Sequence, residues 1–350
     1  MTENVIWEAL RRESDLVRQH LGFGATTIGT VRFERPGLYA QAFFALSIGF
    51  ERAAKLALTL DAAASENGQF LGSSDLRQYG HNLIDLFDAV EQVAIARNLD
   101  GVQRPRTGIH ETILRVLSDF ASNVTRYYNL EILQPASSGA RDPIALWYEE
   151  VIKPILRAHD TEKRRERTER SVEAIAAPSS AVFVVATTET GGSIADLSGL
   201  MRRSAEANAV GPWQRMYVLQ LARFVTRVIS ELGGLLQRTR PDIPFLEEFF
   251  YPFQLDDGDF RRLKVWPPTE LATLSERSAS ESAMSRRTIA FTRPEAPVRT
   301  TALRRTHAPA PIERTHAPGR MRKRRARRQL PGRRCWIHAI AQARRLARSG

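Results

Sequence analysis

Cysteine is the residue that this chain has least of. The one cysteine, Cys335, lies near the C-terminus, which excludes a disulfide framework and a paired CxxC site and fits a reducing cytoplasm. HExxH, GxSxG and clustered histidines are also missing, so we expect no metal site, no cofactor and no serine hydrolase. The acidic start, Met1 to Asn4, lacks the order of a signal peptide.

Long uninterrupted apolar runs are missing too. A membrane-spanning helix needs about 18 or more consecutive apolar residues. The most apolar stretch, around residues 38–60, is interrupted by Glu51, Arg52 and Lys55. We therefore expect a soluble, cytoplasmic protein without a membrane segment.

The net charge of +12 is unevenly distributed along the chain. Residues 277–350 hold 20 Lys and Arg against 3 Asp and Glu, whereas residues 1–276 hold 31 against 36. The first part is mildly acidic, and the basic excess belongs to the C-terminal segment. A high overall isoelectric point is therefore no argument that the fold itself binds nucleic acid.

Apolar residues recur at three- and four-residue spacing through most of the first 240 positions, which predicts amphipathic helices. The stretch 38–64 is apolar on nearly all sides, which is typical of a central helix. The helices expected from this pattern span 4–21, 38–64, 75–97, 109–133, 143–160, 194–208 and 213–238.

Other segments complete the predicted architecture. Residues 31–33 fit a short extended piece, 181–187 form a strand-like run, and the mixed charges of 163–170 fit a solvated helical face. The aromatic segment 245–253 is expected to fold back onto the bundle. The fold class is all-α, a multi-helix bundle with at most one short strand or hairpin and a disordered basic C-terminal tail. We divide it into 1–140, a helical bundle; 141–270, further helices on the same or a second subdomain; and 271–350, the tail.

A polar stripe is the first candidate site. Arg77, His81, Asp85 and Asp88 follow spacings of four, four and three, which would place them on one face of the predicted helix 75–97. A histidine between an arginine and a carboxylate suits acid–base chemistry on a phosphate. A solvent-exposed helical face with ordinary i,i+4 polar pairs would show the same spacing of residues.

Two further groups are candidate binding residues. Glu51 and Lys55 lie in the most apolar helix, where charges either pair with each other or line a cleft or interface. Arg126 and Tyr127 could meet a phosphate or a base, or could wedge a helix end into the core.

Residues 39–60 combine small residues with a Glu-Arg…Lys patch, and with residues 79–83 and 126–129 they resemble the HEPN superfamily of helical domains. The resemblance covers about residues 36–135. Many HEPN proteins are metal-independent ribonucleases that act as dimers through an Arg-x(4–6)-His motif. The resemblance thus implies an RNA- or nucleotide-associated protein of stress or defence systems.

The Arg–His spacings of this chain depart from that motif. Arg77 and His81 have three residues between them instead of four to six, Arg104 to His110 spans a proline and a glycine, and Arg333 to His338 lies in the tail. Enzymatic activity is therefore left open. The competing interpretation is a non-catalytic structural or protein-interaction bundle whose helix 38–60 belongs to the core or to a dimer interface.

The tail carries the basic run that a nucleic-acid tether would need. We expect such a run to bind nucleic acid or an acidic partner without sequence specificity and with an affinity that depends on salt concentration. An out-of-frame stretch of a GC-rich gene would give the same mixture of residues. The alternative that the tail has no selected function therefore stays open. The candidate nucleic-acid contacts are Arg322, Lys323, Arg324, Arg325, Arg327 and Arg328.

Overall fold

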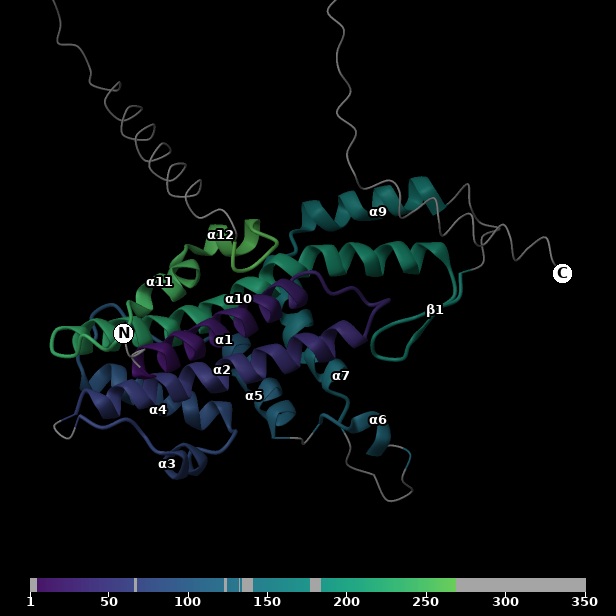
Figure 1. The fold of residues 1–350 in the computed structure, drawn as a ribbon. Helices are drawn as coiled ribbons and strands as arrows, with labels where there is room; N and C mark the ends of the chain where they lie inside the picture. Colours follow the sequence, from purple (N-terminus) through teal and green to yellow (C-terminus); the bar gives the residue numbers. More distant parts are fainter. Residues whose placement is uncertain are drawn as a thin grey trace, which may run out of the picture. The chain divides into compact units, whose positions relative to one another are not determined.

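The structure is a computed structural model, and it describes residues 5–65, 68–122, 125–131, 133, 141–176 and 184–268. These residues form an all-α bundle with one two-stranded antiparallel hairpin, which confirms the predicted fold class for this part of the chain (Figure 1). The predicted tail lies outside the described residues. The elements, in chain order, are α1 (Val5–Ile28), α2 (Gly37–Ala63), α3 (Ser73–Gln78), α4 (Leu83–Ala96), α5 (Gly108–Ala121), α6 (Tyr128–Glu131), α7 (Pro143–Trp147), η1 (Tyr148–Ile152), α8 (Lys153–His159), α9 (Glu162–Ala176), β1 (Ala186–Thr187), β2 (Ser193–Ile194), α10 (Leu197–Gln237), α11 (Leu246–Phe250), η3 (Tyr251–Gln254) and α12 (Asp257–Arg262).

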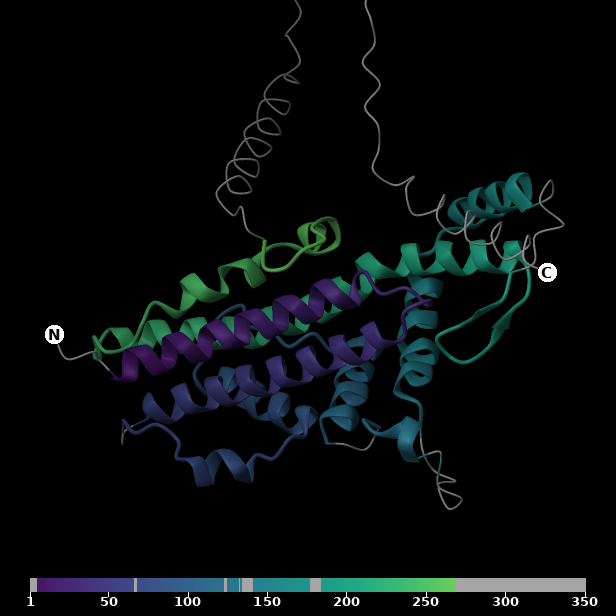
Figure 2. The same cartoon turned by 45° about the vertical axis from the view of Figure 1, so that its right-hand side comes forward.

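Helices α1 and α2 pack side by side as an antiparallel pair (Figure 2). A Cβ atom on Gly24 would lie 2.6 Å from the side chain of Leu46, and one on Gly49 would lie 2.9 Å from that of Leu21. Glycine is therefore required at both positions for the helices to approach this closely. The prediction for α2 is confirmed, whereas α1 continues past the glycines at which we expected the chain to loosen.

Helix α10 is the longest element, with 41 residues, and it packs against α1, α2, α4 and α5. Two separate helices were predicted here, and that prediction is wrong, because Pro212 lies inside one continuous helix. Proline usually interrupts a helix by removing a hydrogen bond. The described residues belong to one compact unit, so the helices after residue 141 complete the bundle begun by the first 140 residues.

The core is filled by apolar and aromatic side chains from α2, α4, α5 and α10. Phe50 meets Phe87 edge to face with ring centroids 5.4 Å apart, and Phe43 meets Phe120 in the same way at 5.6 Å. Such contacts add about 0.5–1.5 kcal/mol to the gain from burial. The helix predicted over 109–133 ends earlier, at Ala121, and the described part of the remaining stretch, up to residue 133, forms only the short α6.

Residues 143–159 are helical as predicted, but the helix widens into a π-turn at η1. Trp147 anchors this segment, since its Nε1 donates to Oε1 of Gln214 in α10 at 2.6 Å. The charged α9 that follows buries only Val172, which confirms a solvated helical face.

The strand predicted over 181–187 is reduced to β1 within the described residues, and residues 181–183 lie outside them. β1 pairs with β2, and the turn between them places Glu189 inward. The Glu189 carboxylate accepts from Arg203 of α10 and from the hydroxyl of Tyr39 in α2 at 3.4 Å. Residues 31–33, expected to be extended, form no strand.

The segment after α10 folds back onto the bundle, as predicted for its aromatic part. Arg215 of α10 is buried and donates to the carbonyl oxygens of Phe260 at 2.8 Å and Arg261 at 2.5 Å, near the end of α12. Burial lowers the pKa of Arg215 to about 10. The partial negative charge at the end of a helix offsets part of the cost of burying this cation.

Candidate functional site

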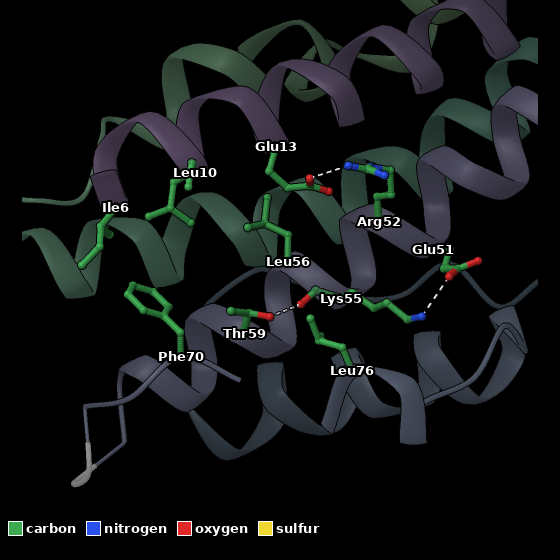
Figure 3. A pocket seen from close by; sticks show the side chains of 11 residues that line it. Ile6, Leu10, Glu13, Glu51, Arg52, Lys55, Leu56, Thr59, Phe70 and Leu76 are labelled. Carbon is green, nitrogen blue, oxygen red and sulfur yellow. Dashed lines mark hydrogen bonds and ion pairs between the residues drawn. The ribbon is translucent and has the colours of Figure 1, made fainter. Parts of the chain in front are cut away.

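A pocket of about 470 Å³ lies between α1, α2 and the segment 68–76 (Figure 3). Pockets that bind small molecules usually fall between about 300 and 1,000 Å³. Polar side chains of α1 and α2 line part of the wall. Its apolar lining consists of Ile6, Ala9, Leu10, Leu56, Phe70 and Leu76. We call this pocket, together with the charged side chains at its edge, the α1–α2 groove.

Two ion pairs form the polar part of the groove. Arg52 donates from Nη2 to Oε2 of Glu13 at 2.6 Å and so joins α2 to α1. Lys55 donates from Nζ to Oε1 of Glu51 at 2.8 Å, an i,i+4 pair within α2. The predicted pairing of Glu51 with Lys55 is therefore present, at the edge of a pocket.

His81, between α3 and α4, meets the same carboxylate. Its Nδ1 lies 3.0 Å from both carboxylate oxygens of Glu51, and its side chain is 66% exposed. Burial raises the pKa of Glu51, but the hydrogen bonds from Lys55 and His81 outweigh it and hold that pKa below the usual value. The groove edge is thus a carboxylate shared by an ammonium group and an imidazole.

The local sequence explains how His81 reaches α2. Gly80 has a φ of +61°, a left-handed conformation that glycine adopts without strain. Asn82 then caps α4 by accepting a hydrogen bond from the backbone N–H of Ile84 at 3.0 Å. His81 therefore lies in a turn between two helices, where its side chain is directed by the turn rather than by a helical face.

The predicted single helix 75–97 is consequently wrong. The stripe of Arg77, His81, Asp85 and Asp88 does not share one helical face, because α3 ends at Gln78 and α4 begins at Leu83. Arg77 is exposed and donates to the carbonyl oxygen of Ser73 at 3.1 Å.

The two aspartates of the stripe lie on α4, apart from the groove edge in their contacts. Asp85 is exposed in the first turn of α4. Asp88 accepts a hydrogen bond from Arg104. The catalytic role assigned to Arg77, His81 and Asp85 stays a prediction, although the geometry that grouped them is not present.

Arg126 and Tyr127 are placed elsewhere. The guanidinium of Arg126 lies 4.8 Å from the ring centre of Phe44 and 5.5 Å from that of Phe120. Tyr127 is half exposed in the turn before α6. The contacts described for Arg126 thus connect it to aromatic rings of α2 and α5 rather than to the groove.

The arginine and histidine of the second such pair, Arg104 and His110, do not contact each other either. Arg104 is buried and is paired with Asp88 and Glu111, whereas His110 turns toward Thr107 and Gln220. The third spacing and the basic run of the tail lie outside the described residues.

Sequence reasoning missed the polar network around His110. Its Nε2 contacts Gln220 of α10 at 2.8 Å, across 110 positions of sequence. The one local signal was a threonine three positions before a histidine at the start of a predicted helix. Such a pattern shows a capping position and says nothing of a distant partner.

Within the described residues, His, Cys, Asp and Glu side chains gather nowhere in a group that could hold a metal ion, and none of the helices is long and apolar enough to cross a membrane. No protein-family model, no curated protein and no solved structure matches the chain.

Proposed function

We propose that the protein is a HEPN-like helical protein that associates with RNA or nucleotides, and that the α1–α2 groove is its binding site. The observation that carries the proposal is the contact of His81 Nδ1 with the Glu51 carboxylate, 3.0 Å away, beside Lys55. A carboxylate that orients an imidazole next to an ammonium group suits acid–base chemistry on a phosphate diester.

The chemistry follows from the tautomer that Glu51 favours. A carboxylate accepts the Nδ1 hydrogen of His81, which leaves Nε2 to take the proton of a ribose 2′-hydroxyl. The 2′-oxygen then attacks the adjacent phosphorus and the bond to the 5′-oxygen breaks. The proton held on Nε2 of His81 passes to the leaving 5′-oxygen, so that a cyclic phosphate, a 5′-hydroxyl and the neutral imidazole result. Lys55 lies next to Glu51 and would stabilise the charge that develops on the phosphate.

Removing His81 tests this proposal directly. We expect His81→Ala to lower cleavage of a single-stranded RNA in EDTA by about a hundredfold or more, because the variant loses its proton acceptor. Gln78→Ala, an exposed change three residues away, serves as the matched control. Equal cleavage by the wild type and His81→Ala, with both proteins folded, would show that the groove does not cleave RNA.

The tail adds a separate, salt-dependent contribution in this proposal. Replacing the six basic residues of 322–328 by glutamine should reduce the slope of log affinity against log salt by up to about 4 for single-stranded RNA. Binding titrations at several salt concentrations measure the slope. An unchanged slope would remove the tail from the proposal and leave the groove chemistry untouched.

A non-catalytic interaction protein is the second candidate, and two observations favour it. Arg52 and Lys55 are each already paired with a carboxylate, so an incoming phosphate must compete with Glu13 or Glu51. Phe44 and Ile48 on α2 are also more than a third exposed, as a surface that meets a second copy would be. Under this alternative His81→Ala changes neither RNA cleavage nor RNA binding, whereas Ile48→Glu weakens self-association in sedimentation.

A further inference from the structure

A threonine hydroxyl and a histidine ring meet at the start of α5, apart from the groove. Thr107 is exposed, and its Oγ1 lies 2.7 Å from Nδ1 of His110, which is 3% exposed. Thr107 occupies the N-cap position, yet its side chain makes no capping hydrogen bond to the backbone. The hydroxyl therefore forms a hydrogen bond with the histidine ring instead of with the backbone at the helix end.

The other ring nitrogen is held by side chains from two distant elements. Nε2 of His110 lies 2.8 Å from Oε1 of Gln220, whose Nε2 donates to Oδ2 of Asp257 at 2.8 Å. Arg223 donates to the second oxygen of the same carboxylate at 2.9 Å. Because Asp257 fixes the amide of Gln220, the amide oxygen faces His110 and accepts its Nε2 hydrogen.

This arrangement leaves Nδ1 of His110 as an acceptor for the Thr107 hydroxyl hydrogen. Burial lowers the pKa of His110, so the ring is neutral near pH 7. A hydroxyl in contact with a base, with the base oriented by a third group, is the general signature of an activated nucleophile. The face beside it is open, since a Cβ atom on Gly108 would meet no atom within 4 Å.

The charges around Thr107 bear on the class of electrophile. Arg104 and Arg106 are engaged by Asp88, Glu91 and Glu111, so carboxylates outnumber cations in this cluster. A dianionic phosphoryl group is disfavoured beside excess negative charge. An uncharged acyl carbonyl meets no such penalty.

We propose that Thr107 is a nucleophile, with His110 as its general base, that accepts an acyl group from a small activated ester. The Thr107 oxygen forms a bond to the acyl carbon, and the bond from that carbon to the leaving oxygen breaks. The hydroxyl proton passes to Nδ1 of His110 and then to the leaving alkoxide. This site is independent of the groove and does not rest on the proposed association with RNA.

Acetylation of the full-length protein by p-nitrophenyl acetate tests the proposal. Release of p-nitrophenolate gives the rate, and mass spectrometry of the tryptic peptide 107–115 shows whether Thr107 carries the acetyl group. Thr107→Val removes the hydroxyl from an exposed side chain, and His110→Gln removes the base. Thr161→Val is the matched control, because Thr161 is also an exposed threonine directly before a helix.

We expect an acetyl group on Thr107 in the wild type and in Thr161→Val, and its loss in Thr107→Val. His110→Gln should acetylate Thr107 about a hundredfold more slowly. Gln220→Leu, which keeps the base and removes its orienting partner, should fall between these rates and covers the case in which His110→Gln does not fold. Acetyl groups on lysines alone, or equal acetylation of Thr107 in the wild type and both network variants, would overturn the proposal.

Discussion

Two histidines of this protein lie in opposite environments, one at the edge of the α1–α2 groove and one inside the bundle. His81 is mostly exposed and shares a carboxylate with Lys55, whereas His110 is buried and its two ring nitrogens contact neutral side chains, Thr107 and Gln220. A group in solvent can exchange its partner for a ligand at small cost, whereas a buried polar group loses stability when a partner is removed. Chemistry at His81 should therefore be separable from folding, and chemistry at His110 should not.

The largest expected effect on stability comes from truncating the buried ring. His110→Ala should lower the free energy of unfolding by about 2–4 kcal/mol, because it leaves a cavity and strands the amide of Gln220. His81→Ala should change it by no more than about 0.5 kcal/mol. Urea unfolding of both variants in one buffer measures the two losses in the free energy of unfolding. Similar losses for the two variants would contradict the difference expected between the two histidines.

The pH dependence of stability should follow the buried histidine. Burial lowers the pKa of His110 below its usual 6.5, so the unfolded chain binds the proton more readily. That contribution is complete above about pH 6.5 and is lost as the pH falls toward the folded-state pKa. Burial lowers the pKa of His159 and of His20 in the same direction.

Thermal melting between pH 8 and 5 checks this expectation. His110→Gln, which cannot titrate, should flatten the decline in stability on acidification. A curve for His110→Gln that runs parallel to the wild type would assign the dependence to other groups.

A small effect on stability is also expected at the carboxylate of the groove. Glu51→Gln should cost no more than about 1 kcal/mol, since the ion pair with Lys55 is partly exposed to solvent. RNA cleavage should fall by about tenfold or more, because the amide orients His81 less well than the carboxylate does. A large loss of stability with unchanged cleavage would give Glu51 a structural role and would weaken the proposed function.

A helix can be predicted from the sequence when nearby residues determine it, and it is missed when distant contacts or a turn determine it. Helix α2 could be predicted because its apolar residues follow a helical period over 27 positions. The break between α3 and α4 was missed because the apolar period continues across Gly80 and Asn82, whose turn chemistry prevails there. Helix α10 was divided at Pro212 because local preference favours an end that tertiary packing overrides.

The candidate site was predictable in its members and not in its arrangement. Glu51, Lys55 and His81 were each singled out from the sequence, but the contact between Glu51 and His81 joins positions 30 apart through a turn. The pairing of Arg52 with Glu13 likewise depends on the register of α1 against α2. The network around His110 joins α5, α10 and α12, and no local pattern records such partners.

The length and late position of α10 set the order in which the chain can fold during synthesis. Helices α1 and α2 are close in sequence and can pair as soon as both have been made. Helices α4 and α5 also pack against α2, but the part of α2 that meets α10 stays uncovered until α10, more than 130 residues later, has left the ribosome. A nascent chain that stops before residue 197 therefore exposes an apolar surface that promotes aggregation. Such fragments should depend on chaperones to stay in solution.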